Sequence, residues 1–314
     1  MNTCLRQFSC ALGLSFLLAP ESRAAFATHA ADTPVIVSSS QDSLPPPAAA
    51  GTRAHLYRMN YWFTVPFIVV GTAANIYAIP RIIKSKPGLT DAELAAINRE
   101  AVPRFDRWVL NQKVDDYRRP DKVSDYVLNG TIVAGVLLGL DKKIRQGALR
   151  LALLYAETQV FTFCLYDYSP FGPAWQNKLR PVVYYDQYPT EDRRQGNNRN
   201  SFYGGHVANA AAASFAAAKI LNDYHPEFSS GTKYLLYGAA TVPPLVVAYL
   251  RTRALKHFPS DNLVGLLIGG ACGVIVPELH RIKKQGIEFW AEARPAGPGV
   301  GMTWRWDEQR ANNK

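Results

Sequence analysis

The chain has 314 residues, enough to bury one substantial core, and one large domain is the expectation. Hydrophobic residues make up 48% of it and its mean hydropathy is −0.11, between the values typical of a soluble enzyme and of a densely hydrophobic transporter. The formal net charge is +10, but the lysines and arginines are spread among apolar segments, without a basic helix face or an RNA-binding motif. The composition therefore argues against nucleic-acid binding and favours a role of the basic charge toward phosphate or a membrane.

The first 54 residues have the pattern of an export leader followed by a tether. Residues 1–31 contain a basic Arg6, an apolar stretch and several small-residue cleavage points, which predicts a signal peptide. Residues 32–54 are rich in Ser, Pro and Ala and cannot bury enough apolar surface to fold alone. We therefore expect the folded part to begin at about residue 55.

Six long apolar runs follow and predict six helices, which places the chain in the all-α class. They cover residues 61–79, 126–140, 148–165, 206–221, 234–250 and 262–279. The second run has 15 residues and would rise only ~22 Å, against a hydrocarbon core of ~30 Å. Full membrane spanning is thus expected for some runs and left open for others. Two of the four cysteines lie in the leader and two in apolar runs, so we expect packing roles and no disulfide framework.

Two polar segments flank the helices of the predicted domain, residues 55–285. Residues 81–125 contain ten basic and eight acidic residues, and Thr90-x-x-Glu93 has the spelling of a capping box, so we expect a solvated connector with a short helix. The C-terminal tail, residues 286–314, alternates polar and apolar residues around Pro and Gly. That alternation predicts a small hairpin.

Three short stretches at predicted helix ends carry basic residues, histidines, a carboxylate and paired glycines. They are Lys178-Leu-Arg180-Pro181, Ser201-Phe-Tyr-Gly204-Gly205-His206 and Arg251-x5-His257-x3-Asp261. Each alone has an ordinary structural explanation: a helix-end anchor, a turn, or a hydrogen-bonded His–Asp pair. Their combination and order favour an anion site.

The third stretch is the strongest signal. Asp261 follows His257 by four residues, with Pro259 at the predicted helix start, and this spacing predicts that both lie on one face. A carboxylate there can hold one imidazole nitrogen and leave the other free to attack. Arg251 ends the preceding helix and can bind two phosphoryl oxygens with its forked donors.

The other two stretches add donors for an anion. Gly204 and Gly205 immediately precede an Ala-rich helix, so their backbone N–H groups and the positive helix end would face a negative ligand, with His206 at the rim. Lys178 and Arg180 supply positive charge, and Pro181 breaks the chain so that the pair lies at a turn.

In this order the stretches resemble the signature motifs of the type 2 phosphatidic acid phosphatase and vanadium haloperoxidase superfamily, namely Lys-x6-Arg-Pro, Pro-Ser-Gly-His and Arg-x5-His-x3-Asp. The resemblance covers roughly residues 57–281 and the six-helix layout, and it looks closest to exported bacterial members, in which phrases such as Lys256-His-Phe-Pro-Ser-Asp261 occur. It implies a membrane-associated, six-helix bundle. It further implies a phosphatase that needs no metal or other cofactor, in the bacterial cell envelope.

The resemblance also implies roles for the motif residues. His257 would be the nucleophile that takes the phosphoryl group, Asp261 would orient it, and His206 would protonate the leaving alcohol and then activate water. The phosphoryl oxygens would be held by Arg180, Arg251, the N–H of Gly205, and Lys178. The implied substrate is a small phosphomonoester or a phosphorylated lipid.

Two positions depart from the family pattern. The family lysine falls on Pro173 and the family serine on Gly204, which removes a cation and a hydroxyl donor from the phosphate cradle. Losing one such donor typically costs about 3 to 4 kcal/mol of transition-state stabilisation. A catalytically weakened or inactive membrane protein that binds lipid phosphate is therefore the alternative, whereas the missing lysine argues against a haloperoxidase.

Topology and one buried acid stay open in the sequence. The basic loop residues 141–145 would face the cytoplasm under the positive-inside rule, which puts the motifs on the periplasmic side. An exported leader followed by six full spans would put the motifs in the cytoplasm. We therefore expect that one helix does not span, either residues 126–140 or 61–79. The alternative is a wholly periplasmic, membrane-peripheral bundle. Glu157, inside an apolar run, is expected to pair with an arginine of the site or to make a plain buried hydrogen bond.

Overall fold

The computed structural model describes residues 56–282, together with the backbone of two strands within 286–305. The predicted signal peptide and tether lie outside the described residues. The described part is helical, as predicted, and the predicted tail hairpin is present as an antiparallel pair, β1 (Gly286–Arg294) and β2 (Gly297–Arg305), with Gly286 opposite Arg305. The α-helices are α2 (Tyr61–Lys84), α3 (Asp91–Ala95), α4 (Arg104–Arg107), α5 (Arg118–Ala134), α6 (Lys142–Arg145), α7 (Ala148–Tyr168), α8 (Thr190–Arg194), α9 (Gly205–Tyr224), α10 (Ser230–Arg253) and α11 (Pro259–His280).

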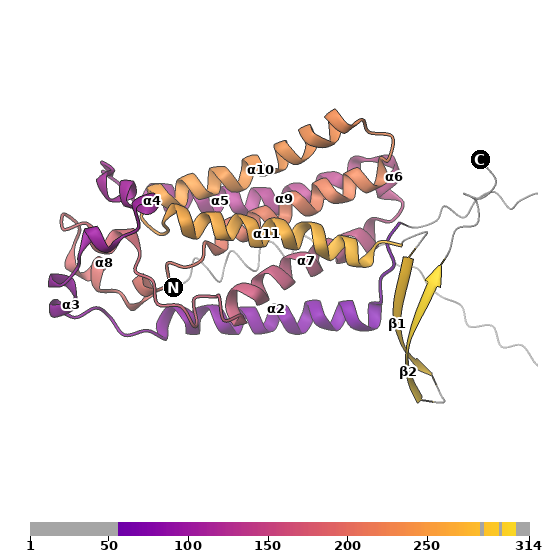
Figure 1. The fold of residues 1–314 in the computed structure, drawn as a ribbon, viewed down its shortest axis with the longest axis horizontal. Helices are drawn as coiled ribbons and strands as arrows, with labels where there is room; N and C mark the ends of the chain where they lie inside the picture. Colours follow the sequence, from indigo (N-terminus) through magenta and orange to yellow (C-terminus); the bar gives the residue numbers. More distant parts are fainter. Residues whose placement is uncertain (1–55, 283–285, 295–296, 306–314) are drawn as a thin grey trace, which may run out of the picture. The chain divides into compact units, whose positions relative to one another are not determined.

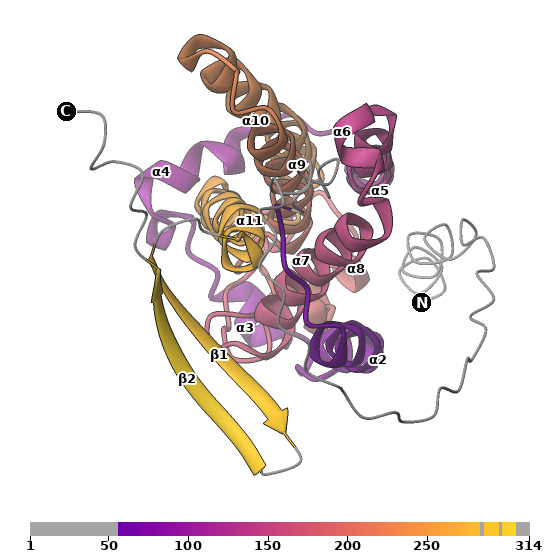
Figure 2. The same cartoon turned by 90° about the vertical axis from the view of Figure 1, so that its right-hand side faces the viewer.

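Helix α9 forms the centre of the bundle. It packs against α5, α7, α10 and α11, and Figure 2, which looks along the helices, shows it among them, while α2 lies outside and packs on α7. The α9 sequence supports this position, because its alanines from Ala208 to Ala213 are all fully buried and let neighbouring helices approach closely. The three signature stretches lie at one end of α9, α10 and α11.

The tightest seam joins α9 to α11 through glycines spaced four residues apart. A Cβ added at Gly265 would overlap Gly204, one at Gly269 would overlap the carbonyl oxygen of Ala208, and one at Gly273 would lie 2.7 Å from the carbonyl oxygen of Ala212. Small residues at this spacing allow two helix backbones to come into contact. The seam therefore fixes the start of α9 relative to the start of α11.

Within the part of the chain that the structure describes, four helices are long and apolar enough to cross a membrane, and they support membrane association: α2, α7, α11, and α5 with its 3₁₀ extension. The last of these corrects the sequence analysis. The helix starts at Arg118, and with the 3₁₀ turn it reaches Leu140, so it has 23 residues instead of 15. Its length is therefore at least about 34 Å. The expected length was too short because a count of apolar residues leaves out the charged first turns.

The segment between α2 and α5 is folded, which corrects the expectation of a solvated connector. Residues 89–114, here called the cap, lie at one end of the bundle, where α3, α4 and α8 are visible in Figure 1. The predicted capping box of Thr90 and Glu93 is present at the start of α3. Apolar cap residues share a buried cluster with residues 182–185, Leu255 and Phe258. The cap thus packs directly on the loop that carries His257, and the bundle end that it covers is called the site end.

Candidate functional site

The structure brings the three signature stretches together at the site end. Arg180 precedes a 3₁₀ turn, His206 lies in the first turn of α9, Arg251 lies in the last turn of α10, and His257 lies in the loop before α11. These residues are close enough for the charges of Arg251 and Arg180 to act on His257. Residues separated by more than 70 positions thus form one cluster.

His257 has a defined tautomer. Its side chain is 1% exposed, and its Nδ1 lies 2.6 Å from the backbone carbonyl oxygen of Ser201. A carbonyl oxygen only accepts hydrogen bonds, so Nδ1 carries the proton and Nε2 keeps its lone pair. Burial, followed by the positive charges of Arg251 and Arg180, holds the pKa of His257 well below its usual range. The imidazole is therefore neutral at neutral pH, with a lone pair on Nε2 that could attack an electrophile.

Asp261 acts on His257 indirectly, which corrects the contact expected from their spacing. Helix α11 begins at Pro259 after its N-cap Phe258, so His257 lies outside the helix and the two residues do not share a helical face. Asp261 Oδ2 accepts hydrogen bonds from the backbone N–H of Phe258 at 2.9 Å and from the hydroxyl of Ser201 at 2.6 Å. The carboxylate thereby fixes the residue after His257 and the residue whose carbonyl group holds the imidazole.

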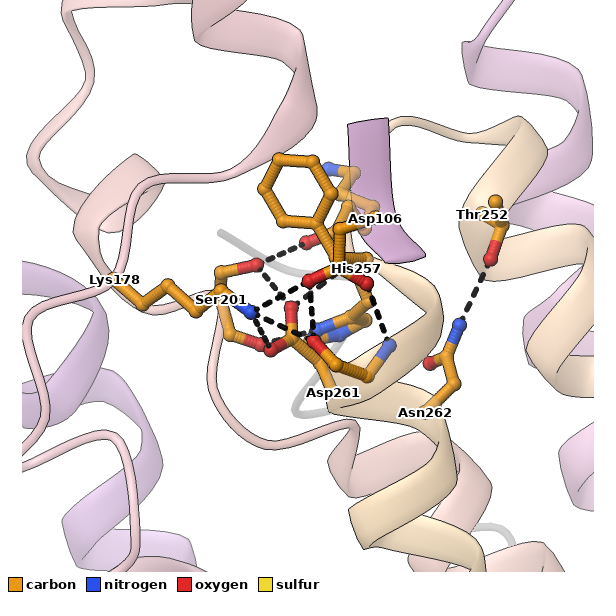
Figure 3. Close-up of polar contacts among 10 residues, drawn as sticks. Asp106, Lys178, Ser201, Thr252, His257, Asp261 and Asn262 are labelled. Carbon is orange, nitrogen blue, oxygen red and sulfur yellow. Dashed lines mark hydrogen bonds and ion pairs between the residues drawn. The ribbon is translucent and has the colours of Figure 1, made fainter. Parts of the chain in front are cut away.

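Lys178 also has a different position from the one expected. Its Nζ lies 2.7 Å from Asp261 Oδ1, 2.9 Å from the Ser260 hydroxyl and 3.3 Å from Asp106 Oδ2 in the cap. Figure 3 draws Lys178, Asp106 and Asp261 in this group of polar contacts. Asp106 in turn accepts the backbone N–H of Ser260 at 2.9 Å. Lys178 is therefore engaged by two carboxylates, Asp106 and Asp261, and its role as a phosphate ligand stays a prediction.

Two arginines form the cationic part of the site. The side chains of Arg180 and Arg251 are buried, and burial lowers the pKa of Arg180 to about 10. Arg180 donates from Nη2 to the Asn200 carbonyl oxygen at 3.4 Å, and Arg251 donates from Nη1 to Asp121 at 2.5 Å and to Ser124 at 3.2 Å. Within residues 56–282, the Nε–H groups of both arginines are buried without a hydrogen-bond partner. Buried donors without partners are costly, and an anion would satisfy them.

Two carboxylates that the sequence analysis missed face this site from α5. Asp121 lies opposite Arg251, and Asp125, one turn later, has its Oδ1 2.9 Å from His206 Nε2. Burial and then the charge of Arg251 lower the pKa of His206, while the hydrogen bond to Asp125 raises it. The available signal was a pair of acids four residues apart in the charged first turns of this helix.

Lys256 is a cation of the site to which the sequence analysis assigned no role. Its Nζ lies 3.1 Å from Asp121 Oδ2, so Asp121 pairs with both Lys256 and Arg251. Burial lowers the pKa of Lys256, and Arg180 lowers it further. The residue immediately before His257 therefore belongs to the same cluster of charges.

The two glycines lie where the sequence predicted, at the start of α9. A Cβ at Gly205 would lie 2.6 Å from the Tyr166 ring, and one at Gly204 would lie 2.7 Å from Asn262 Oδ1. The close approach of α11 thus explains why Gly204 replaces the family serine, and a serine there would need Asn262 to shift. Pro173, at the position of the family lysine, is buried.

Glu157 is part of the opposite end of the bundle. Its carboxylate lies 3.1 Å from the Thr64 hydroxyl and 3.2 Å from His280 Nε2. The expectation that Glu157 pairs with an arginine of the site is thus wrong, and the plain buried hydrogen bond is what the structure contains. Within residues 56–282, no group of three or more His, Cys, Asp or Glu residues is arranged to hold a metal ion.

A comparison with protein families agrees with the resemblance found in the sequence. Residues 148–284 match the PAP2 superfamily. Among solved structures, the chain is similar to the crystal structure of the first transmembrane PAP2-type phosphatidylglycerolphosphate phosphatase from Bacillus subtilis, with 19% identity and a TM-score of 0.38, over 67% of this chain and 94% of that one. No curated protein matches the chain.

Proposed function

Because residues 148–284 belong to the PAP2 superfamily, which supports a phosphatase-type function, we propose that the protein hydrolyses a phosphomonoester or a lipid phosphate through a phosphohistidine intermediate. One observation carries the proposal. Two buried arginines with unpartnered Nε–H groups lie beside a buried imidazole whose Nε2 lone pair is free. A phosphoryl group satisfies these donors and presents phosphorus to that lone pair.

In the first step, Nε2 of His257 attacks phosphorus and the bond from phosphorus to the ester oxygen breaks. The electron pair of that bond goes to the leaving alcohol, which takes a proton from protonated His206. Arg180, Arg251 and the first N–H groups of α9 stabilise the negative charge on the phosphoryl oxygens. The Ser201 carbonyl group, which already accepts the Nδ1 proton, stabilises the positive charge on the phosphorylated imidazole.

In the second step, water attacks the phosphohistidine. His206, now neutral, takes a proton from the water, and the bond from phosphorus to Nε2 breaks, so its electron pair returns to His257. Inorganic phosphate leaves, and both histidines regain their starting states. Asp125 supports this cycle, since its carboxylate keeps the His206 pKa from falling further.

The proposal places the site at the periplasmic face of a bacterial membrane. Support comes from the opposite end of the bundle, where the short segment between α5 and α7 carries Lys142, Lys143 and Arg145. Short basic loops favour the cytoplasmic side. Hydrolysis of a membrane-impermeant phosphomonoester by intact cells that express the protein would support this orientation, and hydrolysis only after lysis would contradict it.

A second candidate function is binding of a lipid phosphate without turnover. It is favoured by the buried Pro173, by Gly204 without a hydroxyl group, and by Asp121, which pairs with Arg251 where substrate would compete for it. Turnover separates the two candidates.

The test is hydrolysis of a generic phosphomonoester and of phosphatidate by the full-length protein in detergent with a chelator present. We expect turnover that the chelator does not reduce and that His257→Ala abolishes. The matched control is His225→Ala, because His225 lies at the other end of α9, where it pairs with Asp141 and Glu227. Equal turnover by His257→Ala and wild type would overturn the mechanism, and no turnover by wild type would favour the binding protein.

A further inference from the structure

We propose that Lys256 is a substrate-binding residue, the third cation that holds the phosphoryl group alongside Arg180 and Arg251. The inference rests on the proposed function and deepens it, because it names the residue that replaces the lysine absent at Pro173. Lys178, the substitute expected from the sequence, is held by Asp106 and Asp261.

Arg251 and Lys256 converge on one anion, the carboxylate of Asp121. Arg251 Nη1 lies 2.5 Å from Asp121 Oδ1, and Lys256 Nζ lies 3.1 Å from Oδ2 of the same carboxylate. The two cations thus reach the two oxygens of a single anion. A phosphoryl group presents pairs of oxygens at a similar spacing, so donors arranged in this way also suit two phosphoryl oxygens.

The cations around Lys256 outnumber the carboxylates that face them. Arg180, Arg251 and Lys256 are close enough that the two arginines lower the pKa of the lysine, in addition to the effect of burial. Asp121 pairs with both Arg251 and Lys256, and Asp125 lies 3.8 Å from Arg251, so two carboxylates face three cations. The Nε–H groups of the two arginines stay unpartnered within residues 56–282. Like charges gathered at a buried position are stabilised by a further anion.

The backbone at the end of α10 positions Lys256. Helix α10 ends in a Schellman motif, in which the Leu255 N–H donates to the Thr252 carbonyl oxygen at 3.1 Å and the Lys256 N–H donates to that of Arg251 at 3.1 Å. Leu255 has a φ of 56°, a left-handed conformation that is unfavourable for leucine and is held by its burial in the cap cluster. This turn brings Arg251, Lys256 and His257 to one place within seven residues.

The experiment measures binding of inorganic phosphate to the full-length protein in detergent by isothermal titration calorimetry, beside the steady-state kinetics of phosphomonoester hydrolysis. We expect Lys256→Met to weaken phosphate binding about 10- to 100-fold, the value of a charge-assisted contact, and to raise KM accordingly. Lys256→Arg should restore part of the affinity. The matched control is Lys122→Met, because Lys122 is exposed on α5 beside Asp121. The phosphate affinity of the Lys122→Met protein should equal that of wild type.

Each outcome separates the inference from the proposed function. If wild type hydrolyses the substrate and folded Lys256→Met has the phosphate affinity and KM of wild type, the inference alone is overturned. A loss of phosphate affinity in Lys178→Met that Lys256→Met does not share would overturn it as well. Phosphate binding that depends on Lys256 without any hydrolysis would support the inference and overturn the phosphatase. Absence of phosphate binding by wild type would overturn the inference as well.

Discussion

The two ends of the bundle both bury charge, but they treat it differently. At the opposite end, Asp223 accepts a hydrogen bond from the Tyr57 hydroxyl at 2.8 Å and pairs with Lys219 and Arg281. Lys219 also pairs with Glu278 at 2.8 Å. At the site end, by contrast, buried guanidinium donors are left over within the described residues.

The contrast indicates which buried charges are structural. Charges that pair with one another hold helices together. Removing one partner leaves the other charge buried and uncompensated, which lowers the stability of the fold. Donors that stay unpartnered in a buried position are expected where a ligand supplies the missing acceptors. Asp261 and Glu278 are 17 positions apart on α11, or about 26 Å, so changes at one end can be tested against changes at the other.

The largest expected effect is on turnover, from a change at the site end. Arg251→Ala should lower kcat/KM about 100- to 1000-fold, because it removes a donor to the phosphoryl oxygens. Arg281→Ala, at the opposite end, should keep kcat/KM close to wild type. Phosphomonoester hydrolysis by the two purified variants checks this, and equal losses in both would remove the distinction between the ends.

A substitution at the opposite end should lower the stability of the protein and leave its turnover unchanged. Lys219→Met leaves Asp223 and Glu278 with fewer partners, and we expect it to lower the free energy of unfolding by about 3 kcal/mol. The kcat of the protein that stays folded should not change. Denaturant unfolding in detergent together with active-site titration measures both, and a large fall in kcat would show that the two ends are coupled.

The glycine seam between the ends should also respond in stability. Gly269→Ala forces a methyl group onto the Ala208 carbonyl oxygen, and we expect a loss of about 2 kcal/mol. Gly270→Ala is the control, because a Cβ there lies 3.7 Å from the Phe215 ring, an ordinary contact. Equal melting temperatures for the two variants would refute the packing of α9 on α11 described above.

The smallest expected effect is a shift in pH dependence from Asp125→Asn. The hydrogen bond to Asp125 raises the pKa of His206, so neutralising Asp125 should lower that pKa. His206 must be protonated to act as the acid, and hence the alkaline limb of the kcat/KM profile should move to lower pH by the same amount. An alkaline limb at the wild-type pH would mean that Asp125 does not tune His206.

Much of the bundle was predictable because its signals are local. Six apolar runs lie on α2, α5, α7, α9, α10 and α11, and the capping box of Thr90 and the alternating tail have short-range signatures. The cap was missed because its apolar residues are scattered among charges. They become a core only against residues 182–185, Leu255 and Phe258, which are distant in the sequence.

The site was predictable in its members and less so in its contacts. The motif spacing identified His257, His206, Arg180 and Arg251, which lie together in the structure. The spacing could not show that His257 precedes the helix, so that Asp261 contacts its neighbours instead. Asp121 and Lys256 were missed because their importance depends on the approach of α5 to the end of α10, which the pair of acids at the start of α5 does not by itself predict.

The central claim is that His257 takes the phosphoryl group. The most direct measurement is to mix the full-length protein with a radiolabelled phosphomonoester, quench in base, and locate the label in the digested chain. The account predicts label on the peptide that carries His257, none in His257→Ala, and normal labelling in His225→Ala. Label on another residue, or turnover by wild type with no labelled protein at any quench time, would contradict it.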